Sequence, residues 1–218
     1  MIELVKIVWH GHACFEIVGK EVNVVTDPHD GHSIGLPPPN TKADVVFVSH
    51  HHFDHEAVDV VKKKDTVVVD RPASDKVKGV EFKSLKTWHD EKHGALRGAN
   101  TVYKFIVDGI SFVHCGDLGH LLTEKEAEDL KPIDVLFVPV GGVYTIDAKK
   151  AYELVKMLDP WVTIPMHYYV EGLKLSLNGV NSFLKLMEGY KKVWSTENYV
   201  EMDEVPKEKT VIVLKPPK

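Results

Sequence analysis

Short apolar runs bounded by turn residues recur along the chain and predict a protein rich in β-strands. The apolar stretches 1–17 and 22–26 predict a hairpin that turns near Gly19. Asp108-Gly109 separates two further apolar runs and is a strong signal for a two-residue hairpin. The later strands are predicted at 44–49, 66–69, 80–88, 101–107, 110–114, 135–140, 161–165 and 211–214.

Helical patterns alternate with these strands in the middle of the chain. Thr123 and Glu126 form a capping-box signature, and Lys62–Lys64 is expected to be a solvated helix end. The segment 29–42 contains three consecutive prolines and is expected to be a long, functional loop. Helices are predicted at 56–63, 123–130, 147–158 and 180–187. This order favours an α/β (α+β) fold of mixed sheets covered by helices over one doubly wound parallel sheet.

Composition adds an expectation about size and setting. The 218 residues predict a single domain, 1–218, and an apolar share of 44% is typical of a globular protein. Lys and Arg number 27 against 32 Asp and Glu, and this acidic balance argues against a general nucleic-acid binder. Cys14 and Cys115 make no disulfide framework, and no apolar stretch is long enough to span a bilayer. We therefore expect a cytoplasmic protein.

Histidine is the first sign of chemistry, with 13 residues, all between His10 and His167. Four side chains form the pattern H-x-H-x-D-H directly after a predicted buried strand: His50, His52, Asp54 and His55. Alternate residues of an extended segment point the same way, so His50 and His52 are able to face one ion. Asp54 and His55 then face a second ion close by. Imidazole and carboxylate ligands suit Zn²⁺, Mn²⁺ or Fe²⁺.

One turn cannot complete two coordination spheres, so further ligands are expected at other strand ends. His89, Asp117 and His167 each follow a predicted strand. His93 lies four residues beyond His89 and is the alternative third ligand of the first ion. His89 is preferred because it adjoins the strand.

These motifs and their order resemble the metallo-β-lactamase superfamily, over nearly the whole chain. The resemblance is to its small intracellular metal-dependent hydrolases, related to L-ascorbate-6-phosphate lactonase and N-acyl-phosphatidylethanolamine-hydrolysing phospholipase D. It implies a four-layer αββα sandwich of two mixed sheets, with a metal site at one edge. The segments that carry it are Trp9-His10-Gly11-His12-Ala13, Thr26-Asp27-Pro28, the H-x-H-x-D-H run, Gly116-Asp117, residues 134–142 and Pro165-Met166-His167-Tyr168.

The resemblance also implies a ligand set for two divalent ions, expected to be zinc, with manganese or iron as alternatives. His50, His52 and His89 would hold the first ion, Asp54, His55 and His167 the second, and Asp117 would bridge them. A hydroxide between the metals would be the nucleophile, because metal ions lower the pKa of bound water towards 7.

Other polar residues are assigned by their nearness to these motifs. His12, Asp27 and His93 are expected beside the ligands or the substrate, and Asp27 either orients a ligand histidine or caps a turn. Asp54 and His120 are the candidate catalytic residues. Rim positions are considered for His29 and His32, while His51 and His114 are not expected to be ligands.

The leading hypothesis is a dinuclear metal-dependent hydrolase acting on a small-molecule ester, lactone or phosphodiester. A metal-dependent nuclease is the second hypothesis, but it fits poorly with a chain whose only arginines are Arg71 and Arg97. A non-catalytic metal-binding or sensing module is the third. We expect a small-molecule substrate, no nucleic-acid partner and no membrane span; a homo-oligomer is left open.

Overall fold

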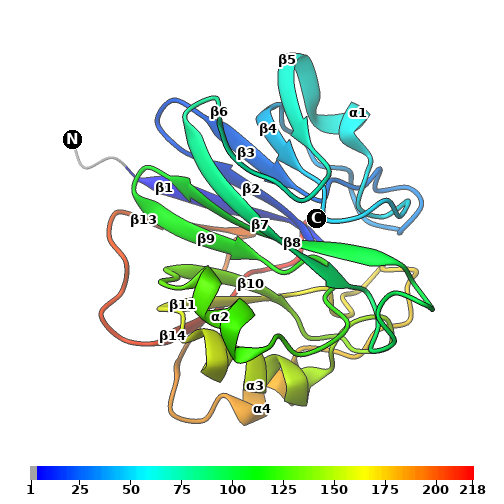
Figure 1. Ribbon diagram of the computed structural model, residues 1–218, viewed down its shortest axis with the longest axis vertical. Coiled ribbons are helices and arrows are strands. Elements are labelled where there is room, and N and C mark those ends of the chain that lie inside the picture. Colours follow the sequence, from blue (N-terminus) through cyan, green and yellow to red (C-terminus); the bar gives the residue numbers. More distant parts are fainter. Residues whose placement is uncertain (1–3) are drawn as a thin grey trace.

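Two β-sheets face each other in the computed structural model, which describes residues 4–218 (Figure 1). The first sheet has the spatial order β13 (Tyr199–Met202), β1 (Val5–Gly11), β2 (Cys14–Val18), β3 (Asn23–Thr26), β4 (Ala43–Phe47) and β5 (Lys62–Val69). The second has the order β12 (Lys191–Trp194), β14 (Thr210–Val213), β11 (Val162–Met166), β10 (Val135–Pro139), β9 (Ile110–His114), β8 (Ala99–Val107), β7 (Val80–Trp88) and β6 (Ser74–Val77).

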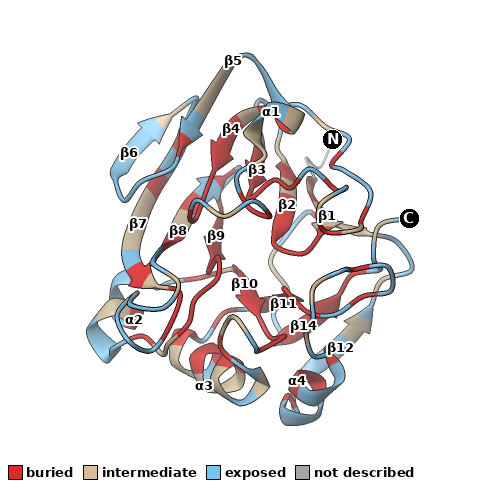
Figure 2. Cartoon of the chain, turned by 90° about the vertical axis from the view of Figure 1, so that its right-hand side faces the viewer, coloured by how far each residue is buried: buried red, intermediate tan, exposed pale blue. Residues whose placement is uncertain are grey.

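Both sheets are mixed, as predicted. In the first, β3, β4 and β5 pair in parallel while β1, β2 and β3 form an antiparallel meander. In the second, β9, β10, β11 and β14 are parallel and β6 to β9 are antiparallel. The inner parallel strands β4, β10 and β11 are almost wholly buried (Figure 2), which explains their continuous apolar runs.

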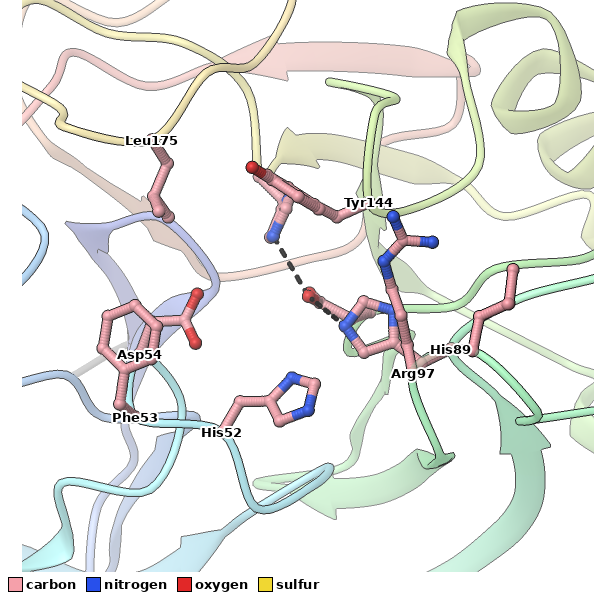
Figure 3. A pocket seen from close by; sticks show the side chains of 10 residues that line it. His52, Phe53, Asp54, His89, Arg97, Tyr144 and Leu175 are labelled. Atoms are coloured by element: carbon pink, nitrogen blue, oxygen red, sulfur yellow. Dashed lines mark ion pairs between the residues drawn. The ribbon is translucent and has the colours of Figure 1, made fainter.

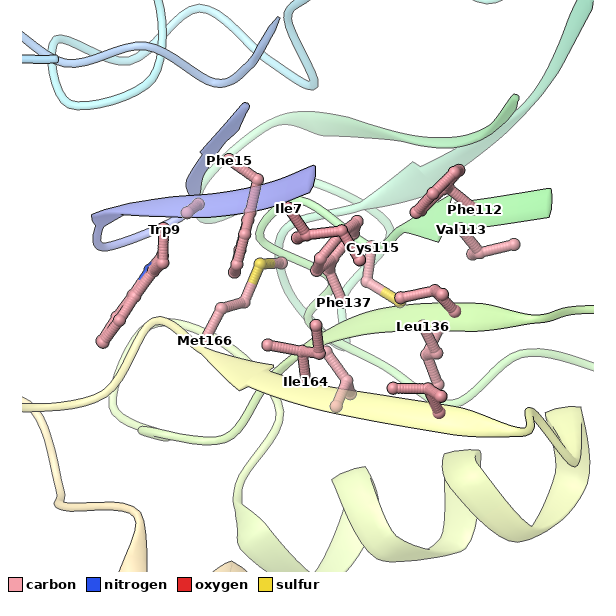
Figure 4. Close-up of a cluster of buried hydrophobic side chains, with 14 of the residues drawn as sticks. Ile7, Trp9, Phe15, Phe112, Val113, Cys115, Leu136, Phe137, Ile164 and Met166 are labelled. Carbon is pink, nitrogen blue, oxygen red and sulfur yellow. The ribbon is translucent and has the colours of Figure 1, made fainter. Parts of the chain in front are cut away.

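Aromatic and aliphatic side chains pack together in the hydrophobic core (Figure 4). Phe15 on β2 stacks on Phe137 of β10 with ring centroids 4.1 Å apart, and Phe137 in turn faces Phe112. Burying one such ring contributes about 1.5–3 kcal/mol, and a favourable aromatic pair about 1 kcal/mol more. This packing holds the two sheets, and therefore the loops at their edges, in a fixed relation.

The helices cover the sheets unequally. Three helices lie on the outer side of the second sheet: α2 (Glu124–Leu130), α3 (Ala148–Leu158) and α4 (Asn181–Leu186) (Figure 1). Thr123 caps α2 in the predicted capping box, and Asp147 caps α3 by accepting from the Lys150 N–H. On the first sheet, α1 (Val58–Val61) packs Val61 against a small apolar patch that includes Val46. The two predicted mixed sheets are confirmed. Within residues 4–218, the helical layer expected over the first sheet consists of the single turn of α1.

The hydrophobic pattern located most elements but not all. The helix predicted at 56–63 is shorter, because Lys62–Lys64 begins β5 instead of ending a helix. The stretch 1–17 forms two strands separated by a turn at His12, and its first three residues lie outside the described ones. The pattern also missed the edge strands β6, β12 and β13, which have no clear apolar run, and β6 and β12 are mostly exposed. Their pairing depends on the neighbouring strand, which overrides weak local propensity. Across residues 4–218, none of the helices has the length and apolar character needed to cross a bilayer.

Candidate metal centre

The ends of strands from both sheets meet at one edge of the sandwich. β4 leads into His50, β7 into His89, β9 into Asp117 and β11 into His167. Within the second sheet, β7, β9 and β11 run in the same direction, so the residues that follow them lie together at one edge, as expected for such sheets, and the turn after β4 meets them there. Residues up to 117 positions apart in the chain are therefore neighbours, and the predicted convergence of four segments is found.

Asp117 lies at the centre of this convergence. Its Oδ2 atom is 3.1 Å from His89 Nε2 and 3.1 Å from His167 Nε2 (Figure 3). Its Oδ1 atom is 3.4 Å from His55 Nε2, and its Oδ2 atom is 3.9 Å from His50 Nε2. One buried carboxylate thus faces four imidazoles that come from three separate loops, because His50 and His55 share the turn after β4.

Two groups of possible ligand atoms flank Asp117. One group contains His50, His52 and His89, and the other contains His12, Asp54, His55 and His167. Within each group all ligand atoms lie within 4.8 Å of one another. The first matches the predicted ligands of one ion. The second contains the three predicted ligands of the other ion together with His12, which the sequence suggested only as a neighbour of the site.

Asp27 organises the turn that carries these histidines. It follows β3, and its Oδ1 accepts from the Ser49 N–H at 2.7 Å. Its Oδ2 accepts from Ser49 Oγ at 2.6 Å and lies 3.0 Å from His55 Nδ1. Of the two roles considered for Asp27, the contacts match the orientation of a histidine, whose second nitrogen then faces Asp117.

The loop that carries Asp117 is held by close backbone contacts. Gly116 has φ +54°, and a Cβ there would lie 2.4 Å from Asn100 Oδ1 and 2.5 Å from Ser49 Cβ. Only glycine fits both the left-handed backbone and this approach. Asn100 accepts from the Asp117 N–H at 2.9 Å and donates to the Cys115 carbonyl at 2.9 Å. These contacts fix the direction of the Asp117 side chain.

The electrostatics of the centre resemble those of a buried ion pair. Burial opposes ionisation of Asp117, but the histidines around it, His167 and His55 first, hold its pKa well below the ordinary value. Burial likewise opposes protonation of His55, yet Asp117 and Asp27 raise the pKa of that imidazole well above 6.5. By contrast, burial and the neighbouring His55 lower the pKa of His50 to about 3. Neutral histidine is the form that binds metal.

Unpaired polar atoms show that the donor set fits a cation. His55 Nε2 and Asp117 Oδ1 are buried and have no hydrogen-bond partner, although they lie only 3.4 Å apart. The Nδ1 atoms of His12, His89 and His167 are also buried and unpaired, whereas the Nε2 atom of each ring faces a carboxylate of the centre. Buried polar groups without partners are costly and call for an explanation. A divalent cation that accepts imidazole and carboxylate ligands supplies one for the atoms that face the centre.

Three residues of the site have left-handed backbones, which non-glycine residues rarely adopt. The φ angles are +52° at His12, +40° at Asp27 and +50° at His167. The His12 carbonyl accepts from the His167 N–H at 3.2 Å and from Trp9 Nε1 at 3.1 Å. The surrounding hydrogen bonds keep these strained turns in place, as is common at functional sites.

The cluster opens into a cleft of about 410 Å³ (Figure 3). Phe53 and Asp54 lie on one side of it, and Arg97 and Tyr144 lie on the other. The lining residues are His52, Phe53, Asp54, His89, Leu96, Arg97, Asp117, Tyr144, His167 and Leu175. The volume is that of a pocket for a small molecule.

Two residues that the sequence assigned to this region lie elsewhere. His93 is exposed, and its ring lies edge-on to Trp88 with centroids 6.3 Å apart, so His89 is the residue that joins the cluster. His120 does not line the cleft: its Nδ1 donates to the Leu121 carbonyl and its Nε2 accepts from the Trp88 N–H. Both ring nitrogens are already bonded to the main chain, and these contacts give no support to a catalytic His120.

The remaining histidines are also placed by their partners. His29 was considered for the rim, but it is buried, donates to the His10 carbonyl at 3.0 Å and accepts from the Gly31 N–H. His32 is exposed and does not line the cleft. His51 points away from the centre towards Glu56, and His114 bonds the main chain, in agreement with their exclusion as ligands. Cys14 and Cys115 are both buried free thiols.

Sequence reasoning missed several residues that support the site. Ser49 and Asn100 hold Asp27 and Asp117, and Asp90 holds the loop after His89. A buried asparagine has no sequence signature. Ser49 and Asp90 adjoin ligand candidates, and such adjacency is the one signal that would have pointed to them.

Comparisons with known proteins agree with this geometry. A family model described as a β-lactamase superfamily domain matches residues 6–167. A metal-dependent hydrolase of Thermoplasma volcanium is 32% identical over 193 residues, which are 75% of this chain and 83% of that protein. Its counterpart in Thermoplasma acidophilum is 30% identical over 191 residues, covering 77% and 84%.

A solved structure extends the match over almost the entire length. A protein of Thermotoga maritima, described as a Zn-dependent hydrolase of the metallo-β-lactamase superfamily, is 43% identical and superposes with a TM-score of 0.79. The match covers 96% of this chain and 98% of that one. The family match, the relatives and the two mixed sheets agree, and the chain belongs to the β-lactamase superfamily with the metallo-β-lactamase fold.

Proposed function

We propose that the protein is a hydrolase that depends on two divalent metal ions and cleaves a small-molecule ester, lactone or phosphodiester. The relatives named above are metal-dependent hydrolases, and one is described as zinc-dependent. The observation that carries the proposal is Asp117, whose two carboxylate oxygens face histidines of both donor groups. A carboxylate in this position suits a bridge between two ions.

The residues that would hold the ions follow from the two donor groups. His50, His52 and His89 would bind one ion. Asp54, His55 and His167 would bind the other, with His12 beside them and hydrogen-bonded to Asp54 at 3.1 Å. Zinc is the first candidate, with manganese and iron as alternatives, because the donors are imidazoles and carboxylates. Bound ions would lower the pKa of coordinated water and polarise a carbonyl or phosphoryl oxygen.

The protein's own groups would perform three tasks around that chemistry. Asp27 and Ser49 keep the His55 ring turned towards the centre. The buried position of Asp117 excludes bulk water from its contacts with the histidines. Asp54 lines one side of the cleft, and its carboxylate is close enough to His12 to exchange a proton with it.

The test combines metal analysis with activity. The purified protein, loaded in turn with zinc, manganese and iron(II), is assayed on p-nitrophenyl acetate, a γ-lactone and bis(p-nitrophenyl) phosphate. We expect close to two ions per chain and turnover of at least one substrate class. Asp54→Ala and His55→Ala should each lose about one ion and most of the rate, while the fold survives.

His51→Ala is the matched control, because His51 belongs to the same turn but its side chain is 60% exposed and faces Glu56. It should keep the metal content and rate of the parent protein. If Asp54→Ala and His55→Ala also bind metal and turn over like the parent, the assignment of those residues is wrong.

A further inference from the structure

Both arginines of the chain lie beside the metal centre. Arg97 lines the cleft over the cluster, and it also lines a second cleft of about 400 Å³ on the other side of the His50–His52 turn. Arg71 and Lys86 line that second cleft as well, with Asp70 as its acidic residue. Both of the chain's arginines therefore lie at this edge of the sandwich. Arginine is the side chain best suited to bidentate binding of a carboxylate or a phosphate.

Among residues 4–218, the Arg97 guanidinium has no acidic partner. It lies 5.5 Å from the centroid of the Tyr144 ring, and one of its nitrogens lies 3.5 Å from the Val143 carbonyl. It forms no ion pair with any acidic side chain in the part of the chain that the structure describes. The carboxylates of the same cleft, Asp54 and Asp117, are both engaged by histidines. A half-buried guanidinium therefore keeps most of its donors for a molecule in the cleft.

The main chain at Arg97 is held in a fixed relation to His89. The intervening loop wraps around Asp90, whose Oδ2 accepts from the N–H groups of Leu96 at 2.9 Å and Arg97 at 2.8 Å. Its Oδ1 accepts from the N–H of Lys92 at 2.7 Å, and the His89 N–H donates to the Gly98 carbonyl at 3.1 Å. A preorganised cation lowers the entropy lost on binding a ligand.

The other residues that line the cleft indicate the chemistry of the rest of the ligand. Phe53, Leu96 and Leu175 line the cleft, and Arg97 is the sole arginine or lysine among its lining residues. Phe53 and Leu96 are exposed, at 57% and 62%. Such a site matches a small molecule that has an apolar body and one anionic group.

We propose that Arg97 binds the anionic group, a carboxylate or a phosphate, of the substrate whose scissile bond lies over the His/Asp cluster. This inference rests on the proposed hydrolase function and names its substrate class. Arg97 is a specificity-determining residue: it selects the substrate and aligns it, and it takes no part in bond cleavage.

The first experiment measures binding without turnover. Metal-loaded parent protein, Arg97→Gln, Arg97→Lys and Lys207→Gln are titrated calorimetrically with benzoate and with phenylphosphonate. Lys207 is the matched control for the loss of one positive charge, because it lies away from the cluster. It precedes β14, and the start of β14 pairs with the start of β11, whereas His167 follows the end of β11. All four proteins should hold the same metal content.

We expect Arg97→Gln to weaken binding of at least one anion by about tenfold or more, as for loss of charged hydrogen bonds. Arg97→Lys should recover part of the loss, and Lys207→Gln should stay within about twofold of the parent. The anion whose affinity falls more in Arg97→Gln indicates whether the natural group is a carboxylate or a phosphate. Equal binding of both anions by the parent and Arg97→Gln would overturn the proposal, as would a loss of metal in that variant.

The second experiment separates this inference from the proposed function. The ratio of kcat/KM for the monophenyl ester of succinic acid to that for phenyl acetate is measured in each protein. The ratio should fall about tenfold in Arg97→Gln and stay unchanged in Lys207→Gln. If Arg97→Gln turns over substrate with the same ratio as the parent, the proposed substrate class is wrong, and the proposed hydrolase function is unaffected. If the parent shows no turnover but binds the anions in a way that depends on Arg97, the proposed hydrolase function is wrong and the proposed anion site stands.

Discussion

His29 and His114 are as deeply buried as His55 and His167, yet their ring nitrogens have opposite surroundings. His29 Nε2 donates to the His10 carbonyl and its Nδ1 accepts from the Gly31 N–H. His114 repeats this arrangement, with the Ala13 carbonyl and the Gly116 N–H. In the cluster, by contrast, the rings face carboxylates, and each of His55 and His167 keeps one nitrogen unpaired.

The difference separates histidines that support the fold from histidines that are available for chemistry. His29 and His114 hold the two sides of the turn between β1 and β2, at residues 10 and 13, and that turn presents His12 to the centre. A ring with both nitrogens bonded to the main chain is neutral and fixed in one tautomer. A ring that faces carboxylates with one nitrogen free is suited to a proton or a metal ion.

The largest expected effect belongs to the cluster. Asp117→Asn keeps the shape of the side chain but removes the charge that faces four histidines. Because loss of a residue that only supports a ligand typically costs 10–100-fold, we expect at least a 100-fold loss of hydrolytic rate and a lower metal content, with an unchanged far-UV circular dichroism spectrum. Metal content and rate equal to the parent would remove the distinction between the two kinds of histidine.

Removal of a fold-supporting histidine should act on stability instead. His114→Leu leaves the Ala13 carbonyl and the Gly116 N–H without their partner in the interior. Since each unsatisfied buried group costs about 1–3 kcal/mol, the loss of both partners should lower the free energy of unfolding in urea by about 2–6 kcal/mol. The control His51→Leu changes an exposed side chain and should cost less than about 1 kcal/mol. Equal losses in the two variants would contradict the comparison.

The smallest effect is a change in pH dependence at His29. Burial lowers the pKa of its imidazole from 6.5 to about 4 in the folded protein. As the pH falls below 6.5, the unfolded chain takes up the proton first, so stability is lost progressively until the pH reaches about 4. The limiting slope is about 1.4 kcal/mol per pH unit.

Urea unfolding of chelator-treated parent and His29→Asn between pH 7.5 and pH 4.5 measures this contribution. The other titrating groups are common to both proteins, so the difference between the two curves belongs to His29. We expect the variant to lose less stability than the parent over this range. Parallel curves would show that His29 does not titrate in the way its burial indicates.

The same two kinds of histidine differ in how far their roles can be predicted from the sequence. The turn His50–His55 and the strand-end residues His89, Asp117 and His167 were found from local pattern, because strand direction alone brings them to one edge. The partners of His114 and His29 were not, since His114 meets a carbonyl 101 positions away. Arg97 and Asp90 gave no pattern either, because their roles arise from the path of one loop. Exposed edge strands such as β6 were missed for lack of apolar residues.

The left-handed backbones at His12, Asp27 and His167 have a consequence for the centre. At each of these positions glycine would suit the main chain better, since it tolerates such angles without steric cost. A glycine there would relieve the main chain but would remove the Asp27 contacts with Ser49 and His55 or the imidazoles of His12 and His167. The side chains that form the centre therefore stand on main-chain angles that oppose them, so the backbone and the metal centre make conflicting demands at these three positions.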